Sequence, residues 1–116
     1  MSLYASGIVR IISEPQLKTF ESGTMVVNFG GGIHEGKDKN GEYINNAIDV
    51  EAWGKTAEII ADNLKKGDSI FVSGNVRMQE WKDKESGANR RKHVLSVSRF
   101  EYLPRAAAQQ VEEAVF

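Results

Sequence analysis

The chain has 116 residues, two prolines and no cysteine, and 41% of its residues are hydrophobic, which suits one packed domain and excludes disulfides and thiolate metal sites. Fifteen basic against sixteen acidic residues give a net charge of −1, so a generally basic surface for a nucleic-acid partner is absent. No apolar run approaches the ~20 residues of a membrane helix and no signal-peptide pattern opens the chain, so we expect a protein of the cytoplasm.

Two β-like segments open the chain. Residues 3–13 are apolar and β-branched and form the first predicted strand, which ends at Glu14-Pro15. Residues 25–33 form the second predicted strand after a turn at 21–24. This second strand contains Gly30-Gly31-Gly32, a run that weakens a strand or lets another backbone come close.

The third predicted strand, residues 44–53, follows a polar loop that contains the hairpin signal Asn40-Gly41. Apolar and other side chains alternate along its second half. The inward set is Ile48, Val50 and Ala52, and the outward set is Asp49, Glu51 and Trp53. We therefore expect one face of this strand in the core and the other face outside it.

The hydrophobic period then changes to that of a helix over 55–67, with Ala57, Ile60, Ala61 and Leu64 on one side. Lys65 and Lys66 are expected at its last turn, before Gly67. Alternation returns in 69–78 and 93–103, which are the fourth and fifth predicted strands, and residues 80–92 are predicted to form a charged loop.

Five strands with one helix between the third and the fourth are typical of the OB-fold, a small Greek-key barrel. The predicted class is therefore all-β with one helix, formed by residues 1–103 and followed by a short tail, residues 104–116. In this fold the face of the second and third strands, with the 1–2 and 4–5 loops, commonly binds oligomers.

The stretch 31–37, "GGIHEGK", has the G-x-x-x-x-G-K spacing of a phosphate-binding loop. Such a loop needs a helix directly after the lysine, whereas Asp38 and Asn40-Gly41 turn this chain back into a strand. No catalytic or metal-ligating motif occurs elsewhere in the sequence, so we predict neither an enzyme nor a metal or cofactor site.

Residues 52–87, "AWGKTAEIIADNLKKGDSIFVSGNVRMQEWKDKESG", carry a family resemblance. With the weaker echoes "SEPQLK" at 13–18 and "SGTMVVNF" at 22–29, the chain resembles the bacterial-type single-stranded DNA-binding proteins over about residues 3–103. The resemblance implies sequence-tolerant binding of single-stranded DNA in replication, recombination and repair, in a bacterial cell or a phage-infected host. It also implies a homotetramer.

The resemblance further implies which residues bind DNA. Trp53 and Trp81 match stacking aromatic positions, and stacking tolerates any base because every base has a π-face. The cations that match phosphate-binding positions or the 2–3 hairpin are Lys18, Lys37, Lys39, Lys55, Lys66, Arg77 and Arg90.

Each assignment has a structural alternative. For Trp53 the alternative to stacking is core burial, which its place on the face opposite Ile48 and Val50 disfavours. For Trp81 it is hairpin packing or a subunit contact, and for the basic residues of 80–92 it is a solvated surface. The second function considered is a replication-restart type of OB adaptor, which acts mainly through protein contacts and binds nucleic acid weakly.

The chain also departs from the family pattern. Two further tryptophan positions hold Gly36 and Ala47, and acidic Asp49 and Glu51 lie on the predicted binding face. We therefore expect single-stranded DNA binding that is weaker, or spread over a smaller site per subunit, than is usual in the family.

The tail "QQVEEAVF" resembles a shortened form of the acidic, phenylalanine-ended tip with which the family docks replication and repair proteins. The residues that would dock are Glu112, Glu113 and Phe116. The alternative is an Ala-rich segment that frays and has no role.

Overall fold

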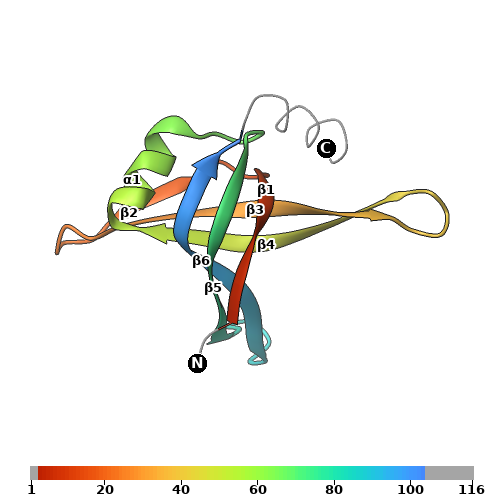
Figure 1. Ribbon diagram of the computed structural model, residues 1–116. Helices are drawn as coiled ribbons and strands as arrows, with labels where there is room; N and C mark the ends of the chain where they lie inside the picture. The colour runs from red at the N-terminus through yellow and green to blue at the C-terminus, as the bar shows by residue number, and fades with distance from the viewer. Residues whose placement is uncertain (1–2, 104–116) are drawn as a thin grey trace.

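A computed structural model describes residues 3–103 of the chain, without the side chains of residues 34–35 and 43–45. It contains six strands and one helix (Figure 1). The strands are β1 (Leu3–Ile11), β2 (Gln16–Thr19), β3 (Met25–Lys37), β4 (Tyr43–Trp53), β5 (Ser69–Lys82) and β6 (Asn89–Tyr102). Helix α1 (Gly54–Asn63) lies between β4 and β5, which are the third and fourth of the five long strands. None of the helices formed by the described residues is long and apolar enough to span a membrane.

The five long strands form a closed barrel. The sheet order is β1-β5-β6-β4-β3-β2, and a further pairing of β1 with β3 joins the two sides of the sheet. That pairing sets Arg10 against Gly32 and Ile11 against Gly31. All neighbours are antiparallel except β4 and β6, which run parallel. This closure, with one helix between the third and fourth long strands, is the predicted OB-fold.

Two hairpins extend beyond the barrel as arms and lengthen the predicted strands. β3 and β4 continue to Lys37 and Tyr43, and β5 and β6 continue to Lys82 and Asn89. Figure 1 shows the β3–β4 arm and the β5–β6 arm leaving the barrel in different directions. The segment 80–92, predicted to be a loop, is therefore largely paired strand. Its charged side chains hid this, because a two-stranded ribbon outside the barrel needs no buried apolar face.

Two other expectations about the elements were wrong. The helix ends at Asn63 rather than 67, because Leu64 already has an extended backbone, so Lys65 and Lys66 follow the helix. The short strand β2 was not predicted, and it pairs with β3 from Gln16 opposite Asn28 to Thr19 opposite Met25. Its four side chains are all exposed, so it carries no apolar alternation that periodicity could detect.

The barrel interior is filled by small and branched apolar side chains from every long strand and from α1, with Val27, Val50, Ile60, Ile70 and Val72 almost fully buried. The inward and outward sets predicted for residues 48–53 are confirmed for Val50 and Ala52, which are buried, and for Trp53, which is exposed. Helix α1 packs on β3 and β4 with Ala57 and Ile60. The barrel therefore fixes the backbone of β4, which carries the candidate site.

Candidate nucleic-acid interface

Trp53, at the end of β4, belongs to an aromatic pair that lies on the barrel surface. Its ring stacks on Phe20, with 6.2 Å between the ring centroids and 11° between the planes. The Lys18 Nζ lies 4.9 Å from the centroid of the Phe20 ring. Trp53 remains 45% exposed, so part of its ring is free to accept another flat group. Lys18, Phe20 and Trp53 thus form a flat apolar surface with a cation beside it.

Glu51 lies two residues before Trp53 on the same face of β4, and its side chain is only 3% exposed. The Trp53 Nε1–H donates a hydrogen bond of 2.7 Å to Glu51 Oε2. Arg77 Nε–H, from β5, donates one of 2.6 Å to Glu51 Oε1, and Arg77 Nη2 contacts the same oxygen. The sequence predicted Glu51 as negative charge on the binding face, but its carboxylate is covered and is neutralised by Arg77.

A polar groove lies beside this cluster, with a volume of about 330 Å³. Its lining comes from residues 13–14 and from β2 to β6, and its polar members include Glu14, Gln16, Asn28, Asp49, Glu51, Arg77, Gln79 and Lys92. Asp49, the second predicted acidic departure, is paired with Lys92 through a 3.1 Å contact between Oδ2 and Nζ. Both carboxylates of β4 that face the groove therefore have a cationic partner, and the groove does not carry two uncompensated negative charges.

Trp81 stands on the β5–β6 arm beyond the other end of the groove, opposite Arg90 in the strand pairing. It is 46% exposed, and the Lys92 Nζ lies 5.7 Å from the centroid of its ring. Because Lys92 also contacts Asp49, it links the arm to the barrel face. The two tryptophans therefore flank the groove, and the prediction that both are exposed is confirmed.

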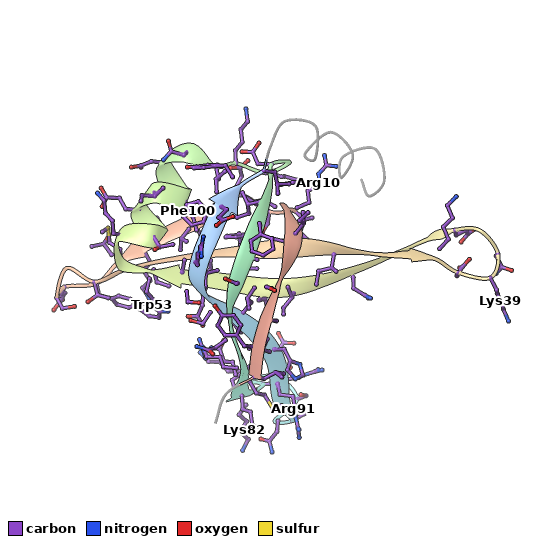
Figure 2. The ribbon with its side chains drawn as sticks, in the orientation of Figure 1. Arg10, Lys39, Trp53, Lys82, Arg91 and Phe100 are labelled. Atoms are coloured by element: carbon purple, nitrogen blue, oxygen red, sulfur yellow. The ribbon has the colours of Figure 1, made fainter. Side chains whose placement is uncertain are left out.

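The β5–β6 arm concentrates positive charge, with six basic against three acidic residues in 77–92. Arg90 is held by Asp83, with 3.3 Å between Nε and Oδ2. Within the described part of the chain, Lys82, Lys84 and Arg91 have no ion-pair partner. Figure 2 shows Lys82 and Arg91 at the end of this arm. These unpaired cations are available to phosphates.

Asp83 organises the turn of that arm. Its Oδ1 accepts a hydrogen bond of 2.9 Å from the backbone N–H of Glu85 and one of 3.4 Å from that of Ser86. These backbone donors, with a smaller contribution from Arg90, hold the pKa of the Asp83 carboxyl below its ordinary value. The turn is therefore ordered while Asp83 is ionised, and this stabilisation is lost only as the pH falls below the ordinary range of an aspartate.

The β3–β4 arm carries Lys37 and Lys39 away from the groove. Figure 2 shows Lys39 at the tip of this arm, far from Trp53 and from Arg91. Asp38 Oδ1 accepts backbone hydrogen bonds of 2.8 Å from Asn40 and 3.0 Å from Glu42, which fixes the turn. Residues 31–37 are strand rather than a loop before a helix, so the phosphate-loop reading is excluded as predicted.

Lys55 and Lys66 do not line the groove, although Lys66 contacts Glu14, which does. Lys55 pairs with Glu58 of the same helix at 3.6 Å. Lys66 is exposed, and its backbone N–H donates a 3.3 Å hydrogen bond to Glu14 Oε1. The predicted docking residues Glu112, Glu113 and Phe116 lie outside the described residues. Among residues 3–33, 36–42 and 46–103, whose side chains the structure describes, no three His, Asp or Glu side chains are grouped so that they could hold a metal ion.

Several residues of this surface were not selected from the sequence. Phe20 follows a strand that periodicity did not detect, and Lys82, Arg91 and Lys92 were counted only as local charge. If the arm had been recognised as a hairpin, the cross-strand pairs Trp81–Arg90 and Gln79–Lys92 would have indicated that these residues are neighbours. The role of Glu51 has no sequence signal, because it depends on a partner on another strand, 26 residues away.

Comparison with known proteins adds three findings. A family model described as "Single-strand binding protein family" matches residues 7–103. The chain is 38% identical over 90 residues to "Single-stranded DNA-binding protein 1" of Synechocystis sp., covering 78% of this chain and 74% of that protein. It is 31% identical over 94 residues to a protein of the same name from Nostoc sp., covering 81% and 76%. These findings give no support to the restart-adaptor alternative.

The fold is also found among solved structures. The crystal structure of a small single-stranded DNA-binding protein from Streptomyces coelicolor matches with a TM-score of 0.74 at 14% identity, over 92% of this chain and 98% of that one. At this identity the likeness concerns the fold, and it agrees with the barrel that the strand pairing defines.

Proposed function

Because the chain belongs to the single-strand binding protein family, we propose that it binds single-stranded DNA along the surface from Trp53 to Trp81, without catalysing a reaction. One observation carries the placement. Two half-exposed tryptophans, on different elements, flank one groove, with Lys92 beside Trp81 and Lys18 beside the Phe20 ring that stacks on Trp53. We further propose that the protein protects single strands in the cytoplasm during replication, recombination and repair.

The chemistry at this surface needs no base-specific contact. Unpaired bases stack on the Trp53–Phe20 pair at one end and on Trp81 at the other, and each stack contributes about 1–3 kcal/mol. Lys18, Lys82 and Arg91 attract the phosphates and release counterions. Glu51 and Asp49 neutralise Arg77 and Lys92 in the groove. This supports a lower DNA affinity than a groove in which both cations were unpaired.

Titration of intrinsic tryptophan fluorescence with oligo-dT tests this function. We expect saturable quenching, since both indoles stack on bases, and an affinity that falls linearly on a plot of log affinity against log salt. Double-stranded DNA of the same length serves as the control and is expected to give little quenching, because its bases are not free to stack. Absence of quenching by oligo-dT at low salt would refute the proposal.

We also propose that the protein assembles as a homotetramer. β1 pairs with β3 only at Arg10 and Ile11, so its earlier residues form an open edge of the sheet, and they expose Leu3, Tyr4 and Ile8 by 67%, 58% and 40%. An apolar edge strand of this kind favours pairing with a second chain. Light scattering is expected to give a mass about four times the 12.9 kDa of one chain, and a monomer mass at micromolar concentration would contradict this assembly.

For the tail, we propose that residues 111–116 form the acidic docking tip for replication and repair proteins. Support comes only from the acidic pair Glu112 and Glu113 and from Phe116. Deleting residues 111–116 is expected to abolish pulldown of such proteins from a bacterial lysate while leaving oligo-dT affinity unchanged. Equal pulldown by both forms would show that the tail has no docking role.

A further inference from the structure

Glu51 is the one charged residue among the buried side chains of the described chain. Burial of a carboxylate is costly unless its oxygens are hydrogen-bonded and its charge is paired. Here each oxygen has its own donor: Oε2 accepts from the Trp53 indole and Oε1 accepts from the Arg77 guanidinium. Both donors belong to side chains that are about half exposed, so the buried carboxylate has two partners that reach the surface.

These bonds restrict how both surface groups can lie. A tryptophan side chain rotates about two bonds, and a hydrogen bond from its Nε1–H to a fixed acceptor removes much of that freedom. Phe20 contacts the same ring in a stack, so the indole is held both at its nitrogen and at one face. The ring is thereby ordered before any base arrives. Binding then loses less side-chain entropy than it would with a freely rotating ring.

We infer that Glu51 is a positioning residue for single-stranded DNA: it holds the Trp53 ring and the Arg77 guanidinium in the arrangement that receives a base and its phosphate. The inference rests on the proposed function and adds to it. Glu51 itself touches no nucleic acid, since its side chain is covered. An acidic residue that by charge alone would oppose DNA therefore favours DNA binding through geometry.

Charge and geometry predict opposite effects of replacing Glu51 with glutamine. Loss of a negative charge next to Arg77 should steepen the salt dependence, by roughly 0.7 in the log–log slope, and tighten binding at low salt. Loss of positioning should weaken the part of binding that salt does not screen. Glutamine has one acceptor oxygen where glutamate has two, so in the same arrangement it accepts from one donor while its NH₂ group faces the other.

The experiment measures oligo-dT affinity over a series of salt concentrations for the full chain and for Glu51→Gln. The affinity extrapolated to 1 M salt is expected to fall about ten-fold, the magnitude of one or two lost hydrogen bonds, while the slope becomes steeper. In a Trp81→Phe background, the only remaining tryptophan is Trp53. Its time-resolved anisotropy is expected to show faster ring motion in Glu51→Gln before DNA is added.

Asp49→Asn is the matched control. It removes the same charge from the same strand and the same groove, where Asp49 pairs with Lys92 and its side chain is half exposed. It is expected to steepen the salt slope without lowering the affinity at 1 M salt and without changing Trp53 anisotropy. Glu51→Met is the second variant: it places an apolar side chain at the buried position, and the released Trp53 and Arg77 can reach water, so the barrel is expected to fold.

The outcomes distinguish failure of the proposed function from failure of the positioning role. If the unmodified chain does not quench with oligo-dT, the proposed function fails. If it binds with quenching of Trp53, but both Glu51 variants keep the affinity at 1 M salt and the Trp53 anisotropy of the unmodified chain, only the positioning role is overturned. A ten-fold loss at 1 M salt in both Glu51 variants, and not in Asp49→Asn, supports it.

Discussion

Replacing Trp53 or Trp81 with alanine is expected to weaken oligo-dT binding by about 1–3 kcal/mol each, which corresponds to a five- to 150-fold rise in the dissociation constant. Each substitution removes one exposed stacking ring, and neither residue belongs to the barrel core. The two rings stand on different elements at opposite ends of the groove, so their free-energy losses should add. Fluorescence anisotropy of a labelled oligo-dT measures both constants without using the protein's own tryptophans.

Tyr102→Ala provides a matched control for these variants. Tyr102 is an exposed aromatic residue of β6 that packs edge-on against Phe100 and lies outside the groove lining. Its removal should leave the dissociation constant within about two-fold, since no base would stack on it. A loss at Tyr102 equal to that at Trp53 would show that exposed aromatic area in general, rather than the groove, determines binding.

The fold was largely predictable because most elements obey a simple hydrophobic period. In β4 the apolar Val50 and Ala52 alternate with the residues of the opposite face, and in α1 Ala57 and Ile60 recur at helical spacing. Their order along the chain then limits the architecture to a small barrel. The elements that escaped prediction lack this signal: β2 is exposed throughout, and in the β5–β6 arm the strand residues 77–82 and 89–93 are all exposed.

The candidate site was predictable only in part, for a related reason. Exposure of Trp53 follows from alternation within one strand, so sequence alone indicates it. The covered state of Glu51 depends on Arg77 from β5, and the stacking of Trp53 depends on Phe20 from beyond β2. Such contacts arise from strand register, which local patterns do not specify. The sequence therefore indicated which residues face outward but not which of them hold one another in place.

Gly74→Ala is expected to cost about 3 kcal/mol of unfolding free energy or more, the upper part of the range for an overpacked core. A Cβ added at Gly74 would lie 1.9 Å from the carbonyl oxygen of Ser96 and 2.9 Å from Cα of Val97. Both atoms belong to the backbone of β6, so no side-chain rotation can relieve the overlap. The strand register also shifts between Ser73 and Gly74, which marks a β-bulge at the point where β5 and β6 approach closely.

The consequence reaches the binding surface, because β5 and β6 continue from this bulge into the arm that carries Trp81. Urea unfolding measures the loss, and Gly7→Ala is the control: Gly7 lies in β1 opposite Val72, and an added Cβ there meets nothing within 4 Å. Gly7→Ala should change the unfolding free energy by less than about 1 kcal/mol, because the added methyl group overlaps no atom and alanine only restricts the unfolded chain. If Gly74→Ala matched it, the close approach of the two strands would not be required for folding. If instead Gly74→Ala is strongly destabilised, and its folded fraction binds oligo-dT weakly, the bulge both stabilises the barrel and orients the arm that carries Trp81.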